Sequence, residues 1–275
     1  EGAQARAARA MASLTCGNAA TRATIAAGLV ALMASKRDQN RAARAMEIFS
    51  RGKADNCGAI AEADGITTLV QHVASGKAET ATLAVLRRLA CDAVGIGTRY
   101  FLRVSTHYRG HTYVHADILA YIKPKNRATI VDALVALVAS GAAGGQERAA
   151  AALAVLACDV PNQTAIAAAG GVVALVAFLT HGAAAGREAA ARALGALACV
   201  VTNRSAIADA GGIDPLVALV RNGAAGGQEA AAAALAWLAY DDAANRAAIA
   251  AAGGIPPLVA LVRNGAAGGQ EAAAA

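Results

Sequence analysis

The chain has 275 residues, and its 25 lysines and arginines outnumber its 19 aspartates and glutamates, for a formal net charge of +6. Hydrophobic residues make up 57% but aromatic residues only 3%, because the apolar excess is mainly alanine, the strongest helix former. This composition predicts an all-α protein, and the most hydrophobic run, 164–180, is too short and too broken by glycine to predict a transmembrane helix.

The first segment, residues 1–92, is predicted to contain helices built on a phrase that ends in Ile25 and again in Ile60. The copy at Ile25, IAAGLVALMAS, lacks about five residues between its first two helices, so we expect these to fuse or to pack differently. His72 aligns with leucine or phenylalanine in other copies, which favours a core position over a catalytic one. The segment opens within an incomplete first unit.

Residues 93–125 interrupt the pattern with about thirty extra residues rich in tyrosine and histidine. Alternating apolar residues around Arg109-Gly110 allow a loop or a β-hairpin. His107, His111 and His115 follow the i, i+4, i+8 spacing of a helical metal site, although the β-branched and aromatic composition disfavours that helix. The alternatives are a loop that contacts RNA or a protein partner, a neutral surface loop, and translated non-coding sequence such as a retained intron.

Residues 126–275 contain the regular copies. The isoleucines of the phrases NQTAI, NRSAI and NRAAI, which are Ile166, Ile207 and Ile249, lie 41 and 42 residues apart. Each regular copy continues with AGG, an apolar segment that ends at a glycine, and a third alanine-rich segment that starts after Gly-Gly. This punctuation predicts three helices in each unit, with a truncated last unit. The copy at Ile130 is abbreviated like that at Ile25.

Apolar residues at i, i+3 and i+4 give each helix one stripe, which a single unit cannot bury, so neighbouring units are expected to stack. Four of the five cysteines occupy one slot at the end of the third helix: Cys16, Cys91, Cys158 and Cys199. One slot in each stacked unit predicts a small buried packing residue rather than a metal ligand.

The phrases NRSAIADAGGIDPLVALVRNG (203–223) and NRAAIAAAGGIPPLVALVRNG (245–265), with the third-helix phrases ALAVLACD and ALAWLAYDD, resemble the armadillo repeat family. HEAT repeats are the minor rival. The resemblance implies a right-handed α-solenoid with three helices in each unit and about six units, two of them abbreviated. The domains would be armadillo repeats over 1–92, the insertion over 93–125, and further armadillo repeats over 126–275.

The resemblance also implies a concave groove lined by the third helices, which holds extended partner segments. Nuclear-import members carry tryptophan and asparagine ladders there, two residues before and after the core leucine. This sequence has neither ladder. The position two residues before the core residue holds arginine in three copies, Arg9, Arg44 and Arg192. The groove candidates are Arg6, Arg9, Arg41, Arg44, Arg88, Arg148 and Arg192, together with Trp237, the single tryptophan.

Guanidinium groups suit bidentate contacts to carboxylate or phosphate, so the arginines predict an acidic or phosphorylated protein segment as partner. Their alternative role is to solvate alanine-rich helices. Residues 1–127 carry 18 basic and 9 acidic groups, which also allows binding to nucleic acid or to an anionic membrane surface. We expect a protein-binding scaffold inside the cell, in cytoplasm or nucleus, with no enzymatic activity, cofactor or metal.

Overall fold

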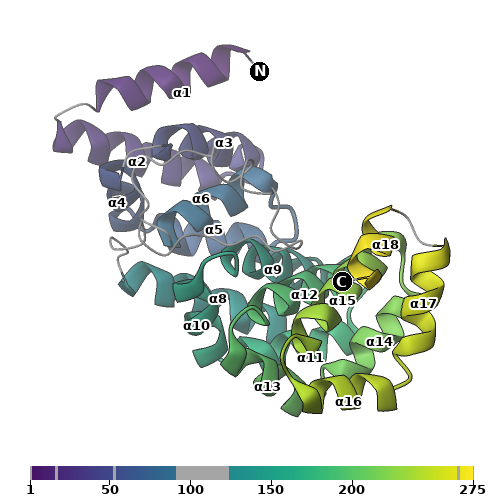
Figure 1. Cartoon of the computed structure of the whole chain (residues 1–275). Helices are drawn as coiled ribbons and strands as arrows, with labels where there is room; N and C mark the ends of the chain where they lie inside the picture. The colour runs from purple at the N-terminus through teal and green to yellow at the C-terminus, as the bar shows by residue number, and fades with distance from the viewer. Residues whose placement is uncertain (1, 16–17, 52–53, 91–123, 265–266, 275) are drawn as a thin grey trace. The chain divides into compact units, whose positions relative to one another are not determined.

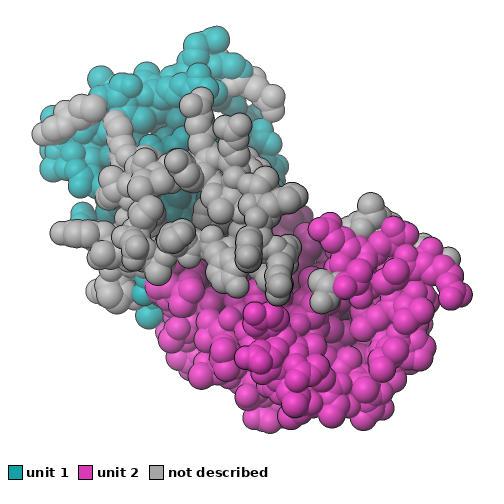
Figure 2. Space-filling view, in the orientation of Figure 1, with its two compact units in different colours: residues 1–130 teal, residues 131–275 magenta. Residues whose placement is uncertain are grey.

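The computed structural model describes residues 2–15, 18–51, 54–90, 124–264 and 267–274. Every regular element in these ranges is a helix (Figure 1). The chain divides into two compact units, residues 1–130 and 131–275, and the division falls inside one long helix (Figure 2). The predicted all-α class is confirmed. The insertion, with His107, His111 and His115, lies outside the described residues except for its last two positions.

Unit 1 contains shorter and less regular repeats. Its helices are α1 (Gly2–Leu14), α2 (Ala19–Ala34), α3 (Gln39–Ser50), α4 (Ala54–Glu62), α5 (Gly65–Ala74), α6 (Thr80–Ala90) and the start of α8 (Pro124–Ser140). Within the described residues of unit 1, only α4–α6 form a full triplet. The two abbreviated copies each form one continuous helix, α2 and α8, so of the two expected outcomes, fusion of the first and second helices or a different packing, the structure shows fusion.

Unit 2 contains the regular repeats. After α8 its helices are α9 (Ala143–Leu156), α10 (Val160–Ala168), α11 (Gly171–His181), α12 (Ala184–Leu197), α13 (Val201–Asp209), α14 (Ile213–Asn222), α15 (Ala225–Ala239), α16 (Ala243–Ala251), α17 (Ile255–Asn264) and α18 (Ala267–Ala274). They form three consecutive triplets, α10–α12, α13–α15 and α16–α18. This is the predicted α-solenoid of three-helix repeats.

The third helices stack against one another within each unit. In unit 1, α3 packs between α1 and α6, and in unit 2 α9, α12, α15 and α18 pack each against the next. Small residues allow this close approach: a Cβ added at Gly195 of α12 would lie only 3.4 Å from the Cα of Ala234 in α15. The alanine-rich composition therefore places the helix backbones close together, while Leu194 and Leu235 fill the core.

The turn between first and second helices depends on its two glycines. Gly170 has a φ of +76°, in the left-handed region that glycine enters without steric cost. At Gly171 a Cβ would lie 2.6 Å from the carbonyl oxygen of Ile166, so no other residue fits without a backbone shift. The AGG phrase thus fixes the sharp bend between α10 and α11.

A buried asparagine fastens each regular first helix to the preceding third helix. The side-chain amide of Asn203 in α13 donates to the carbonyl oxygen of Leu197 near the end of α12, at 3.0 Å. Three further amides do the same: Asn56 to Phe49, Asn162 to Leu156 and Asn245 to Leu238. These bonds satisfy helix-end carbonyls that otherwise lack a partner.

The prediction of a buried cysteine slot is wrong for its two described members. Cys158 and Cys199 are exposed, whereas Cys57, which lies outside the series, is buried. The helices α9 and α12 end at Leu156 and Leu197, so each cysteine comes just after the C-cap residue, at the exposed end of its third helix.

The prediction that His72 occupies a core position is confirmed, because His72 is 1% exposed within the core of unit 1.

Candidate partner-binding grooves

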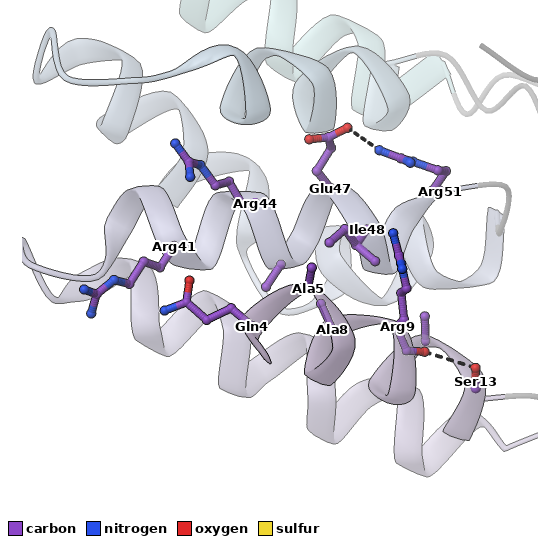
Figure 3. Close-up of a pocket in the computed structure, with 12 residues that line it drawn as sticks. Gln4, Ala5, Ala8, Arg9, Ser13, Arg41, Arg44, Glu47, Ile48 and Arg51 are labelled. Carbon is purple, nitrogen blue, oxygen red and sulfur yellow. Dashed lines mark hydrogen bonds and ion pairs between the residues drawn. The ribbon is translucent and has the colours of Figure 1, made fainter. Parts of the chain in front are cut away.

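Two neighbouring third helices of unit 1, α1 and α3, enclose a hollow of about 720 Å³ (Figure 3). It is lined by Gln4, Ala5, Ala8, Arg9, Ala12, Ser13, Arg41, Arg44, Ala45, Glu47, Ile48 and Arg51. Four arginines therefore face one glutamate over a floor of alanines and one isoleucine. Figure 3 shows Arg9 extending from α1 toward the α3 side of the hollow.

Three of the four arginines are held by carboxylates. Arg41 pairs with Asp38 at 3.3 Å, and Arg51 pairs with Glu47 at 2.9 Å. Arg44 donates through Nε and Nη2 to Glu79, just before α6, with a shortest distance of 2.8 Å. These exposed pairs orient the guanidinium groups but stabilise the fold weakly.

Arg9 differs from the other three arginines. No ion pair involves Arg9 within the described ranges, and its side chain is exposed on α1. Its backbone carbonyl accepts a hydrogen bond from Ser13, which leaves the guanidinium unaffected. It is therefore the arginine of this hollow that can meet an added anion without giving up a described carboxylate.

Glu47 is the shared counter-ion of the region. It pairs with Arg51 and also with Arg88 of α6, whose Nη2 lies 3.6 Å from the Glu47 carboxylate. Arg88 Nη1 also donates to the Glu47 backbone carbonyl at 3.2 Å. Burial lowers the pKa of Arg88, and the charge of Glu47 opposes that effect. Glu47 thus couples α3 to α6 while it reduces the positive charge of the hollow.

A second hollow, of about 270 Å³, lies between α12 and α15 of unit 2. It is lined by Arg192, Gly195, Ala196, Glu229, Ala230, Ala233 and Trp237. Arg192 pairs with Glu188 one turn earlier on α12, at 2.7 Å. The floor consists of small residues, and one wall is the tryptophan ring.

Five of the eight predicted groove residues line one or the other of the two hollows. Arg9, Arg41 and Arg44 line the α1/α3 hollow, and Arg192 and Trp237 line the α12/α15 hollow. Arg6 lies beside Gly2 at the start of α1, Arg88 contacts Glu47, and Arg148 is half-buried on α9. None of these three lines either hollow.

Sequence reasoning missed a buried arginine behind Trp237. Arg204 of α13 is 6% exposed; its Nε donates to the carbonyl of Ala198 at 2.8 Å and its Nη1 to that of Tyr240 at 2.7 Å. Its guanidinium also lies 5.4 Å from the centre of the Tyr240 ring, which meets Trp237 edge-on at 6.1 Å. Arg204 therefore ties the ends of α12 and α15 and supports the tryptophan wall.

Comparisons with known proteins agree with this architecture. The armadillo/beta-catenin-like repeat family matches residues 202–239. An engineered protein of known structure is 28% identical, with a TM-score of 0.64 over 90% of this chain and 93% of its own. The chain is built from armadillo repeats. A comparison with curated proteins finds no match.

Two designed armadillo proteins share the fold at lower identity. One was solved in complex with the peptide (KR)4; it is 17% identical, with a TM-score of 0.61 over 90% of this chain and 96% of its own. Another was designed for modular peptide recognition and is 17% identical, with a TM-score of 0.60 over the same shares. At this identity the likeness establishes the fold alone.

The armadillo register read from the sequence places both predicted slots in the hollows. Arg9 and Arg44 precede the core residue by two positions, Ser13 and Ile48 follow it by two, and all four line the α1/α3 hollow.

Within the described ranges, no single helix is both long and apolar enough to cross a membrane, although two sharply bent helix pairs, 160–181 and 243–263, reach that length and composition together.

Proposed function

We propose that this armadillo chain is a non-catalytic scaffold that binds an extended, acidic or phosphorylated segment of a protein partner in the α1/α3 hollow of unit 1. The observation that carries the proposal is the lining of that hollow, where four arginines face a single glutamate. Arginine forms paired hydrogen bonds to carboxylate and phosphate, so this lining favours an anionic segment over a cationic one.

The placement of the arginines supports an extended segment rather than a single anion. Arg9 comes from α1, whereas Arg41 and Arg44 lie on successive turns of the α3 face. An extended chain advances about 3.3 Å in each residue, so alternate side chains of a bound segment would meet charges from both helices. The intervening alanines leave room for its backbone.

Two of the structural neighbours are named for peptide binding or recognition, which supports a peptide-binding role for this fold. The neighbour with a (KR)4 peptide holds a cationic ligand, whereas the α1/α3 hollow is itself lined by four arginines and would repel such a ligand. We therefore transfer peptide binding and not the ligand; the extended segment across the third helices is what the resemblance to armadillo repeats implies.

The test is the affinity of a fluorescent glutamate-rich peptide, and of its phosphoserine counterpart, measured by anisotropy with the full chain. The double variant Arg9→Glu/Arg44→Glu is expected to bind about tenfold more weakly, because two charge-assisted contacts become repulsive. The double variant Lys36→Glu/Arg37→Glu is the matched control, since it makes the same change in charge and both residues are exposed in unit 1 but line neither hollow. Equal affinities for the double variant and the wild type would remove the proposal.

A second candidate is binding to nucleic acid or to an anionic membrane surface. The excess of 18 basic over 9 acidic residues in 1–127 favours it. Such binding follows total charge rather than the position of two arginines, so Lys36→Glu/Arg37→Glu would weaken it as much as Arg9→Glu/Arg44→Glu does. Retention by RNA or by phosphatidylserine vesicles at about 0.15 M salt would support this candidate.

A further inference from the structure

The outer side of α17 is an exposed apolar surface. Ile255, Val259 and Val262 follow one another at i, i+4 and i+7, so they share one side of the helix, and their side chains are 57%, 52% and 43% exposed. The same three positions of α14, which are Ile213, Val217 and Val220, are at most 7% exposed. There the Gly-Gly turn of the next repeat covers them, since a Cβ added at Gly254 would lie 3.2 Å from a methyl group of Val217. The outer side of α17 is therefore one half of a repeat-to-repeat interface.

The neighbouring helix α18 continues this surface. Ala274 is exposed, whereas the alanines at the same position of α12 and α15, Ala191 and Ala232, are 0% and 1% exposed. Glu271, one turn earlier on α18, is also exposed. The end face of unit 2 is defined here by Ile255, Val259, Val262, Glu271 and Ala274.

The opposite half of the same interface is exposed on α1. Ala7, Ala10 and Leu14 lie at i, i+3 and i+7, all three are exposed, and Leu14 is 67% exposed. The corresponding residues of α12 and α15 are all 0% exposed: Ala190, Ala193, Leu197, Ala231, Ala234 and Leu238. In α15 this side of the helix faces the preceding third helix, because a Cβ added at Gly195 of α12 would lie 3.4 Å from the Cα of Ala234. We call Ala7, Ala10 and Leu14 the start face.

The charges beside the two faces are complementary. Where α12 meets α15, the Glu188 carboxylate lies against the start of α15, since a Cβ added at Gly226 would lie 2.6 Å from one of its oxygens. Glu271 occupies the position of Glu188 in its repeat, and Gly2 that of Gly226. The start of α1 attracts a carboxylate as a positive helix end, and the guanidinium of Arg6 lies beside Gly2.

The overall charges of the two segments act in the same direction. Residues 1–127 carry 18 basic and 9 acidic groups, a formal charge of +9. Residues 128–275 carry 7 and 10, a formal charge of −3. The field around each molecule therefore brings the end face of one copy toward the start face of another, and disfavours contact between two start faces.

We propose that the partner of the end face is a second copy of this chain, which docks head to tail through its start face and places the start of α1 against Glu271. The contact goes beyond the acidic-segment site, because none of the start-face residues lines the α1/α3 hollow. A head-to-tail contact leaves one face free at each end of the dimer, so further copies can add. Only a few side chains take part, so the association is weak, like that of interfaces below about 1,200 Å².

The test uses two variants of the full chain that each lose one face. The end-blocked variant is Val259→Glu/Ala274→Glu, and the start-blocked variant is Ala10→Glu/Leu14→Glu. All four side chains are exposed, so the helix content measured by circular dichroism is expected to stay unchanged. The control is Val173→Glu/Ala177→Glu, which adds the same charge at exposed positions of α11 outside both faces.

Sedimentation velocity over about a hundredfold range of concentration measures the association. The wild type and the control are expected to rise above the 27.1 kDa of one chain as concentration increases. Each blocked variant alone is expected to stay a monomer. Their mixture is expected to form a dimer that grows no further, because one start face and one end face remain to pair.

Several outcomes would overturn the proposal. These are a wild type that stays a monomer throughout, a mixture that forms no dimer, and a start-blocked variant that dimerises alone, which would show that end faces pair with each other. The position of Glu271 is tested separately: Glu271→Arg is expected to weaken the wild-type association about threefold, and Glu62→Arg, the same change at an exposed site on α4, to leave it unchanged or stronger. An unweakened association in Glu271→Arg would remove the proposed alignment of the two faces.

Discussion

The two units use the same stacked third helices but hold them together differently. In unit 1 neighbouring helices are joined by side-chain ion pairs, such as Arg44 with Glu79 and Arg88 with Glu47. In unit 2 a residue of the first helix donates to the carbonyls at the ends of two successive third helices: Gln163 to Ala157 and Ala196, and Arg204 to Ala198 and Tyr240. The joining residues of unit 2 therefore lie away from its hollow.

This difference determines what each hollow presents to a partner. In unit 1 Arg44 both joins helices and lines the hollow, so stability and charge are coupled there. In unit 2 the third helices meet through glycine and alanine, so the hollow keeps a bare floor on which one tryptophan and one carboxylate dominate. Changes in unit 1 are expected to affect binding and stability together, and those in unit 2 to separate them.

The largest expected effect concerns the joining residue of unit 2. Arg204→Met removes two hydrogen bonds from a charged donor to helix-end carbonyls and is expected to lower the free energy of unfolding by about 3 kcal/mol. Urea unfolding followed by Trp237 emission measures it. Arg246→Met is the control, because Arg246 occupies the same slot one repeat later, is exposed, and makes a single bond to Ala239. A loss as large in the control would show that burial and double bonding are not the cause.

A pH effect on stability is expected in unit 1. His72 donates to or accepts from the Thr82 hydroxyl at 3.0 Å, and its Nε2 is buried without a described partner. Burial lowers the pKa of His72 below its ordinary 6.5, against the smaller opposing effect of Glu79. The folded state therefore binds the proton less readily than the unfolded state, so stability is lost as pH falls below about 6.5, by at most about 1.4 kcal/mol per pH unit.

The double variant His72→Leu/Thr82→Ala restores the pair that regular repeats carry, Leu219 and Ala231. It is expected to remove this pH dependence, as measured by hydrogen exchange of α5 and α6 peptides between pH 7 and pH 5, after correction for the intrinsic exchange rate. A slope that persists in the double variant would place the titrating group elsewhere. The peptides of α14 and α15 serve as the internal reference, because α14 carries Leu219 at the position that corresponds to His72.

The charge of the α1/α3 hollow is expected to respond to its counter-ion. Glu47→Gln removes the carboxylate that pairs with Arg51 and Arg88, so an acidic peptide is expected to bind about threefold more tightly. Glu62→Gln removes the same charge from an exposed site on α4 and is the control. If both variants raise the affinity equally, the peptide responds to net charge and not to this hollow.

The repeat period and the helix triplets can be predicted because they depend on residue spacing and on the glycines and prolines that end or begin helices. The irregularity of the two abbreviated copies, which form the single helices α2 and α8, is predicted by the missing residues in each. The slots that line the hollows could also be assigned, because helical periodicity fixes which residues share a face. Arg41, Arg44 and Arg192 lie on faces that line the hollows. Their carboxylate partners were not foreseen, because Glu79 reaches Arg44 only through the packing of α3 against α6.

Arg204 and the cysteine slot show what the sequence does not contain. Arg204 follows the asparagine of its repeat, as Gln163 and Arg246 do, but only the stack brings two helix ends within reach of its guanidinium. The sequence indicates a shared role for these residues only through the recurrence of a polar residue directly after the asparagine of each regular repeat. The recurrence of the cysteines in each repeat predicts burial, but a residue also recurs at the exposed edge of a stack, where Cys199 lies.

The smallest expected effect tests whether the irregular turns of unit 1 cost stability. Asp64 occupies a left-handed conformation, φ +61°, where regular repeats carry glycine, and its side chain makes no capping bond. Asp64→Gly is expected to stabilise the α4–α5 turn by about 0.5–1 kcal/mol, since glycine enters this region freely. The reciprocal Gly170→Asp, where an added Cβ meets nothing within 4 Å, is expected to destabilise unit 2 by a similar amount through the backbone alone. Hydrogen exchange of the two turns measures both, and changes of the same sign in both variants would show that side-chain contacts, and not backbone conformation, set the choice of residue.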